Sequence, residues 1–305
     1  MNFGFEQHMA RDKRYPRATE FVEVVKGLWD SWAEDAFIQD RETGQFLEPS
    51  RVHMLEHEGE HFKVRGPLNI ARPIQGHPVM FTAGQSEAGR ELAAKLADCQ
   101  FAVAMTKESA VALYSDIKGR LAKYGRTPDM LKIFPCVSVY VGRTAEEADE
   151  LYKQVTELIS PNVGVEFLSK TLDVDLTGLD LDGPVPEISS EEALGMDSVR
   201  KVASNFIKAA NLTIRQAYQT LLPLSSGPLF KGSPTQVADQ IEDWYTSGAC
   251  DGLMIGIPVS PKGLEDFVDL VVPELQRRGI VRTEYTGRTL RENLGLARPT
   301  NRFFG

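Results

Sequence analysis

The chain has 305 residues, of which 42% are hydrophobic and 25% charged. That composition can fill a packed core and excludes wholesale disorder, and the length suits one large α/β barrel or two smaller domains. The 43 acidic residues exceed the 34 basic ones and give a net charge of −9, which disfavours nucleic acid and anionic membranes as partners. The longest apolar runs are far shorter than the roughly 20 residues that a bilayer span needs.

The cysteines indicate a reducing compartment. Cys99, Cys136 and Cys250 lie far apart in the sequence, a spacing that fits neither a disulfide framework nor a zinc ribbon. The first fifteen residues are charged and lack the apolar stretch of a secretory signal. We therefore expect a cytoplasmic protein.

The first quarter of the sequence predicts a helix and then an irregular segment. Apolar residues recur at helical spacing in residues 17–32. Residues 43–75 carry Gly, Pro and His between short alternating pieces, which predicts a long excursion containing a small hairpin.

Beyond residue 75, predicted strands and helices alternate. Each strand is a short, nearly continuous apolar run, and an amphipathic helix follows it, a pattern typical of a parallel sheet covered by helices. Residues 173–222 predict an insertion with a helical segment over residues 198–222, and Ser233 opens a capping box for the next helix. The four predicted strands are residues 78–84, 100–105, 133–141 and 252–258.

Residues 57–61 read His-Glu-Gly-Glu-His, which satisfies the motif of zinc proteases. In such a motif His57 and His61 bind zinc from one face of a helix, and Glu58 activates a water molecule. Gly59 disfavours a helix by about 1 kcal/mol, and the residues that follow alternate as in a strand. A polar hairpin is the favoured interpretation, with a zinc hydrolase as the lesser alternative.

The turn at residues 82–89 is a candidate phosphate site, because it joins a predicted strand to a predicted helix. A helix N-terminus presents unpaired amides and the positive end of the dipole. Gly84 allows a close turn, Ser86 can cap the helix or donate to a phosphate oxygen, and Gly89 allows close packing. Glu87 in the first turn would compete with a bound anion unless it points away. An ordinary turn capped by a serine is the alternative.

Longer stretches carry a family resemblance. They are the Arg14-Tyr15 pair, Leu-Trp-Asp-Ser-Trp at residues 28–32, Gly-Pro-Leu-Asn at residues 66–69, Ala-Gly-Gln-Ser-Glu-Ala-Gly at residues 83–89, and residues 267–276. On these stretches the chain resembles the long flavin-dependent monooxygenases of the bacterial-luciferase superfamily, specifically the nitrilotriacetate and dibenzothiophene-sulfone monooxygenase group. The resemblance extends over residues 2–299.

The resemblance implies one (β/α)8 TIM-barrel domain over residues 1–305, with insertions. It also implies a two-component monooxygenase, which uses reduced FMN and O2 to oxidise a small substrate of the aminopolycarboxylate or organosulfur type. A separate NAD(P)H-dependent flavin reductase would supply the reduced FMN, and a homo-oligomer is a further expectation.

The family's FMN-phosphate turn corresponds to residues 83–86 of this sequence, where Gln85 replaces the first serine of a Ser-Ser pair. Tyr15 matches a tyrosine near the flavin, and Arg11 stands where the family usually has histidine. An arginine can pair with a phosphate through two parallel hydrogen bonds. The residues expected to hold FMN are Arg11, Tyr15, Ala83, Gly84, Gln85 and Ser86.

The resemblance also suggests that part of the barrel is missing. The family's chains continue upstream of residue 2, and four predicted strands are half of the eight in a closed barrel. We therefore expect the C-terminal half of the barrel, an N-terminally truncated domain of doubtful activity on its own. A non-catalytic half-barrel protein or a truncated gene product is the alternative. The inward-facing apolar residues expected on this basis are Met80, Val103, Val137 and Ile255.

Overall fold

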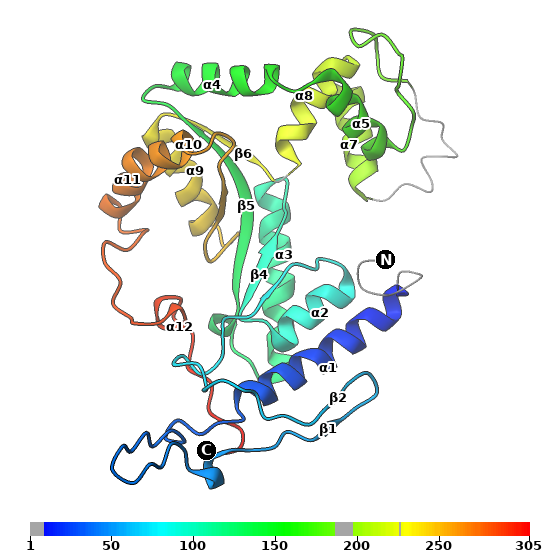
Figure 1. The fold of residues 1–305 in the computed structure, drawn as a ribbon. Helices are drawn as coiled ribbons and strands as arrows, with labels where there is room; N and C mark the ends of the chain where they lie inside the picture. The colour runs from blue at the N-terminus through cyan, green and yellow to red at the C-terminus, as the bar shows by residue number, and fades with distance from the viewer. Residues whose placement is uncertain (1–8, 187–197, 226) are drawn as a thin grey trace. The chain divides into compact units, whose positions relative to one another are not determined.

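The computed structural model describes residues 9–186, 198–225 and 227–305 (Figure 1). The chain forms two compact units. The first comprises residues 1–102, 112–134 and 283–305, and the second comprises residues 103–111 and 135–282. Both units combine parallel strands with helices.

The first unit contains one parallel pair of strands, one antiparallel pair and several helices. In chain order its elements are α1 (Arg11–Trp29), η1 (Pro49–Arg51), β1 (His57–Glu58), β2 (Lys63–Val64), β3 (Phe81–Thr82), α2 (Glu87–Leu96), β4 (Cys99–Ala102), the larger part of α3 (Lys107–Arg120), η2 (Leu121–Tyr124), η3 (Pro128–Met130) and α12 (Leu290–Asn293).

The parallel pair β3 and β4 supports α2. Phe81 pairs with Cys99 and Thr82 with Gln100. Small residues of α2, including Ala93 and Ala94, are fully buried, which lets the helix lie close to its neighbours. The core of this region consists of Ala93, Ala94, Ala97, Ala102, Ile117, Leu121, Leu131 and Ile133.

A buried ion network joins the end of α1 to the last residues of the chain. Asp30, only 1% exposed, accepts hydrogen bonds from Arg72 (3.0 Å) and His77 (2.8 Å) through Oδ1. Its Oδ2 accepts a hydrogen bond from Nε of Arg302 (3.3 Å). Arg72 also donates to the carbonyl of Pro299 (2.8 Å). The C-terminal residues are thus held against α1 by the half-exposed Arg302, which pairs with the buried Asp30, and by the hydrogen bond from the buried Arg72.

The second unit is centred on β5, which begins in the first unit. Its elements are β5 (Lys132–Val141), α4 (Ala145–Glu157), α5 (Pro161–Leu172), α7 (Ser198–Ala210), α8 (Ile214–Leu224), β6 (Leu229–Gly232), α9 (Pro234–Thr246), β7 (Met254–Gly256), α10 (Lys262–Asp266), the π-helical turn η4 (Phe267–Val271) and α11 (Val272–Arg277). β5 pairs in parallel with both β6 and β7.

Alternate residues of β5 pack against helices of the second unit. Val137 and Val139 are buried in one core with Phe230 of β6 and with Val237 and Trp244 of α9. The expectation that Val137 faces inward, on the side that the missing strands would cover, is therefore wrong. Side chains alternate between the two faces of a strand, and the sequence alone does not show which set faces the helices. In the structure, Val137 belongs to the set that packs against α9.

Two further predictions need correction. Strand β6 was not predicted, because Leu229 and Phe230 are too short an apolar run to stand out before Gly232. The described residues therefore contain five parallel strands, β3–β7, rather than four. The single helix expected over residues 198–222 is two helices, separated at Asn211, whose φ is +50°.

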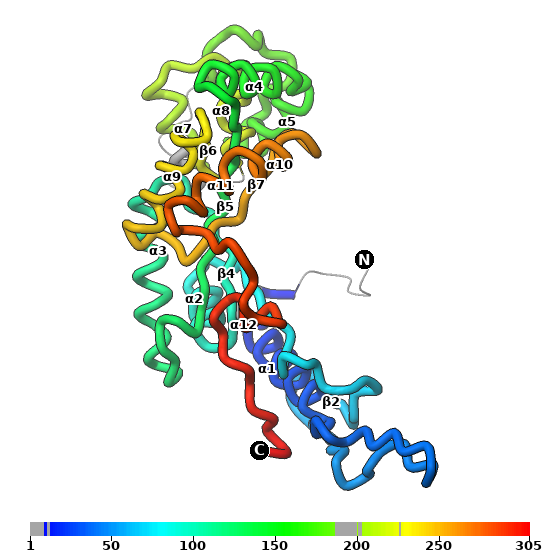
Figure 2. The backbone as a smooth tube through the Cα atoms, turned by 90° about the vertical axis from the view of Figure 1, so that its left-hand side faces the viewer, coloured from blue at the N-terminus to red at the C-terminus, as the bar shows by residue number. Residues whose placement is uncertain are grey.

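The helices α5, α7 and α8 lie side by side, as both views show (Figure 1 and Figure 2). Their shared core includes Leu168, Leu172, Ile207, Ile214 and the fully buried Tyr218. Part of the predicted insertion, residues 187–197, lies outside the described residues. In the described part of the chain, every helix is either too short or too polar to cross a bilayer.

Candidate functional site

Two hydroxyl groups meet at the N-terminus of α2. Ser86 is the N-cap of this helix, and its Oγ accepts a hydrogen bond from the amide of Gly89 (3.2 Å). The hydroxyl of Tyr15, from α1, lies 2.9 Å from the same Oγ. Ser86 is exposed and Tyr15 is half-buried, so both hydroxyls border an accessible site at the positive end of a helix dipole.

The turn before α2 is packed too closely for side chains. A Cβ on Gly84 would lie 3.1 Å from Cα of Gly89 and 3.2 Å from the hydroxyl oxygen of Tyr15. A Cβ on Gly89 would lie 2.6 Å from the carbonyl carbon of Gly84. Glycine at both positions therefore lets the strand-to-helix turn contact the first turn of the helix directly.

Gln100 of β4 holds the turn in place through a hydrogen bond to Gly84. Its side chain is fully buried, and its amide nitrogen donates to the carbonyls of Gly84 (3.2 Å) and Phe101 (2.9 Å). Its amide oxygen accepts a hydrogen bond from the hydroxyl of Thr82. Gln100 is not among the residues predicted for the site. The available signal was a lone glutamine inside an otherwise apolar strand, because a buried amide requires partners.

The carboxylate of Glu87 is turned aside by arginines. Both of its oxygens accept hydrogen bonds from Arg120, at 2.6 and 3.0 Å, and one also accepts from Arg90 at 3.1 Å. The hydrogen bonds from Arg120 are the main reason that the pKa of Glu87 lies below its usual value. The competition for an anion that the sequence suggested is therefore offset by these ion pairs.

The structure brings three of the six sequence-predicted residues into one site, namely Tyr15, Gly84 and Ser86. Ala83 is exposed and Gln85 is half-buried in the same turn. Arg11 is the first residue of α1, and its side chain lies outside the described part of the structure. The assignment of these residues to FMN stays a prediction.

The His-Glu-Gly-Glu-His segment forms an antiparallel hairpin. His57 pairs with Val64 across β1 and β2, so the two histidines are not one helical turn apart. The hairpin is held by Glu20 of α1, whose carboxylate accepts from the amides of His61 (2.9 Å) and Phe62 (2.8 Å) and lies 3.1 Å from Nε2 of His57. The helical zinc motif is therefore wrong for this segment.

The charge of Glu20 is stabilised by that hairpin. Burial acts to raise the pKa of Glu20, but the hydrogen bonds from His57 and the two backbone amides outweigh it and hold the pKa below its usual value. Within the described ranges, no group of three or more His, Cys, Asp or Glu side chains is placed to hold a metal ion.

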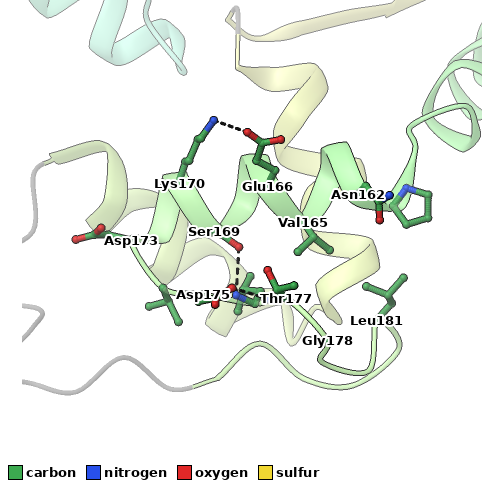
Figure 3. Close-up of a pocket in the computed structure, with 13 residues that line it drawn as sticks. Asn162, Val165, Glu166, Ser169, Lys170, Asp173, Asp175, Thr177, Gly178 and Leu181 are labelled. Carbon is green, nitrogen blue, oxygen red and sulfur yellow. Dashed lines mark hydrogen bonds and ion pairs between the residues drawn. The ribbon is translucent and has the colours of Figure 1, made fainter.

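A separate cavity of about 690 Å³ lies in the second unit (Figure 3). One side of α5 and the loop at residues 173–181 line it, and Ser169, Lys170 and Asp175 contribute polar groups. Lys170 is paired with Glu166, and the hydroxyl of Ser169 accepts from the amide of Leu176. The cavity contains none of the predicted FMN residues.

Parallel strands that alternate with helices are typical of α/β proteins, (β/α)8 barrels among them, and the capped, glycine-packed start of α2 after β3 is typical of a phosphate site. The family model of the luciferase-like monooxygenases matches residues 2–251. The chain therefore belongs to the luciferase-like monooxygenase family, and the resemblance seen in the motifs is confirmed. The predicted TIM-barrel fold class is confirmed with it.

Two relatives align with nearly the whole of this chain. The chain is 48% identical to nitrilotriacetate monooxygenase component A of Aminobacter aminovorans, over 98% of this chain and 66% of that protein. It is 44% identical to N-acetyl-S-(2-succino)cysteine monooxygenase of Bacillus subtilis, over 99% of this chain and 69% of that protein. The chain thus spans about two thirds of the length of these relatives.

A solved structure matches in three dimensions as well. It is the crystal structure of a riboflavin lyase with modified FMN and the substrate riboflavin. The TM-score is 0.77 at 29% sequence identity, and the match covers 96% of this chain and 64% of the other.

Proposed function

We propose that this chain binds FMN through its phosphate at the N-terminus of α2, and that it acts in a two-component flavin-dependent monooxygenase. The observation that carries this proposal is the pair of hydroxyls from Tyr15 and Ser86 above a glycine-packed helix start. Family membership and a structural relative that contains a modified FMN support it.

The residues present suit a phosphate group. One hydroxyl proton bridges Tyr15 and Ser86, and the second is available to donate to a phosphate oxygen. The amides of the first helical turn add donors and a positive dipole end. Gly84 lets the turn pack directly against Gly89 and against the hydroxyl of Tyr15, which places that hydroxyl beside the start of the helix. When bound in its reduced form, the flavin supplies the electrons with which O2 is activated.

We propose a small organic anion as the substrate. The names of the two relatives describe substrates with several carboxylate groups, and one of those substrates also contains a thioether. This chain would then act on an aminopolycarboxylate or on an organosulfur carboxylate. Ala83, Gln85 and Arg11 remain proposed contributors to FMN binding.

We propose an NAD(P)H-dependent flavin reductase as the partner that delivers reduced FMN. The relative named component A supports an arrangement of at least two proteins. A cytoplasmic location is proposed because the three cysteines are thiols rather than disulfides. A homo-oligomer is proposed as the assembly.

The Ser86→Ala and Tyr15→Phe variants test the phosphate site. Each removes one hydroxyl from the pair, and we expect each to weaken FMN binding about tenfold, the usual loss for a hydrogen bond to a charged group. Riboflavin, which lacks the phosphate, should bind all variants equally. Titration of intrinsic flavin fluorescence measures both affinities.

Thr213→Ala is a matched control for Ser86→Ala. Thr213 caps α8 as Ser86 caps α2, so both variants lose about 1 kcal/mol of capping free energy. Only Ser86→Ala should change the ratio of FMN to riboflavin affinity. Equal FMN affinity in Ser86→Ala, Tyr15→Phe and the unmodified chain would contradict the proposed site.

Turnover is tested separately with a flavin reductase, NADH, FMN, O2 and nitrilotriacetate. Consumption of nitrilotriacetate that depends on this chain supports the monooxygenase proposal. FMN binding without oxidation of this or of a thioether carboxylate would favour the non-catalytic alternative.

A further inference from the structure

A carboxylate in the first turn of α2 is a direct competitor for a phosphate. Glu87 follows the N-cap Ser86 immediately, and the helix dipole favours its negative charge as it favours that of a phosphate. The side chain is 72% exposed, so without a partner its carboxylate would be free to rotate toward the phosphate site. Its observed position depends on the groups that hold it.

Arg120 of α3 holds Glu87 through both carboxylate oxygens. Nη1 lies 2.6 Å from Oε1 and Nη2 lies 3.0 Å from Oε2, the parallel geometry that makes arginine pairs directional. Arg90 adds one contact of 3.1 Å to Oε2. The carboxylate is thereby directed at α3.

The guanidinium of Arg120 is itself fixed. Asp116 accepts from both Nε and Nη2 at 3.0 Å, and Glu91 accepts from Nη1 at 3.1 Å. The side chain of Arg120 is only 18% exposed. It is therefore a rigid support for Glu87, unlike a long cation that moves freely in solvent.

These residues belong to a set that we term the α2–α3 ion cluster, which has equal numbers of acidic and basic side chains. Its members are Glu87, Arg90, Glu91, Asp116, Arg120 and Lys123. Loss of Arg120 leaves the charge of Glu87, the member next to the N-cap Ser86, without its main partner. Such a charge opposes a phosphate there.

We propose that Arg120 is a positioning residue for the phosphate site, which keeps Glu87 away from the anion that the start of α2 binds. This inference rests on the proposed FMN function. It assigns to α3 a part in discriminating FMN from flavins without a phosphate. The hydrogen bonds from Arg120 also keep the pKa of Glu87 low, so this carboxylate stays ionised at neutral pH.

A double-mutant cycle over Arg120 and Glu87 tests the proposal. We expect Arg120→Gln to weaken FMN binding about fivefold, comparable to one charged contact at a helix end, and to leave riboflavin binding unchanged. Glu87→Gln alone should not weaken FMN binding. The double variant should return to within about twofold of the unmodified chain, because the competing carboxylate is gone.

Lys123→Gln is the matched control. It removes the same charge from the same cluster, but Lys123 is paired with Glu91 rather than with Glu87. Its effect on FMN affinity should stay below about twofold. Arg120→Lys keeps the charge without the parallel geometry and should fall between Arg120→Gln and the unmodified chain.

The outcomes distinguish failure of the positioning role of Arg120 from failure of the proposed FMN site. If the unmodified chain binds FMN more tightly than riboflavin and Arg120→Gln does too, by the same ratio, the positioning role is overturned. A double variant as weak as Arg120→Gln would overturn it as well, since the defect would then be structural. If the unmodified chain does not prefer FMN to riboflavin, the proposed function fails and the inference fails with it.

Discussion

A Gly89→Ala variant is expected to lose at least tenfold in FMN affinity and about 1–3 kcal/mol in free energy of unfolding. The new Cβ would lie 2.6 Å from the carbonyl carbon of Gly84 and 2.8 Å from its Cα. Both atoms are backbone, so the turn itself must move, and Gly84 and Ser86 move with it. Fluorescence titration with FMN and urea denaturation measure the two effects.

Gly119→Ala is the matched control for Gly89→Ala. Gly119 lies in α3, and a Cβ there would meet no atom within 4 Å. Alanine lowers the entropy of the unfolded chain and favours helix, so this variant should be unchanged or more stable by up to about 1 kcal/mol. Comparable losses in both variants would show that the close packing at Gly84 does not matter.

An Asp30→Asn variant is expected to lose about 3–5 kcal/mol of unfolding free energy. The substitution keeps the size of the side chain but leaves Arg72 and His77 buried without the negative partner that both share. The contact between Asp30 and Arg302 is weakened at the same time. Urea denaturation at neutral pH measures the loss.

The exposed pair of Asp35 and Arg51 provides a control for Asp30→Asn. Its side chains are 65% and 48% exposed, with 3.3 Å between the charged atoms. Asp35→Asn should therefore change stability by less than about 0.5 kcal/mol. A loss below about 1 kcal/mol in Asp30→Asn would contradict the assigned role of the buried network.

The contribution of Asp30 should depend on pH in a defined direction. Burial acts to raise the pKa of Asp30, but the hydrogen bonds and charges of His77 and Arg72 outweigh it, so the folded pKa is below the unfolded one. The stabilisation is then complete above about pH 4, the usual range for Asp, and is lost as pH falls through the folded pKa. The stability gap between the unmodified chain and Asp30→Asn should narrow below about pH 4.

The features that the sequence predicted correctly depend on residues that are neighbours in the chain. The N-cap Ser86, the turn at Gly84 and the capping box at Ser233 all follow from local chemistry, and the structure has each of them. Tyr15 could be linked to Ser86 only through the family resemblance, because 71 residues separate them.

The features that the sequence did not predict depend on distant partners. Glu87 was identified as a competitor of phosphate, but Arg120, 33 residues away, carries no local sign that it restrains this carboxylate. The hairpin at His57 is closed by Glu20, and nothing in the short motif records that contact. The sequence places Gln100 in a strand, but its hydrogen bond to the carbonyl of Gly84 depends on the pairing of β3 with β4.

Helix α1 connects Tyr15 with the C-terminal residues that contact Asp30. Its 19 residues form a rod about 28 Å long, with Tyr15 near one end and Asp30 as the residue that caps the other. A ligand that binds at the Tyr15 end of α1 raises the free energy needed to unwind the helix. Arg302 contacts the other end of the same helix through Asp30. If FMN binds at the proposed site, residues 299–302 should therefore become more resistant to proteolysis when FMN is added, although they contact the opposite end of α1.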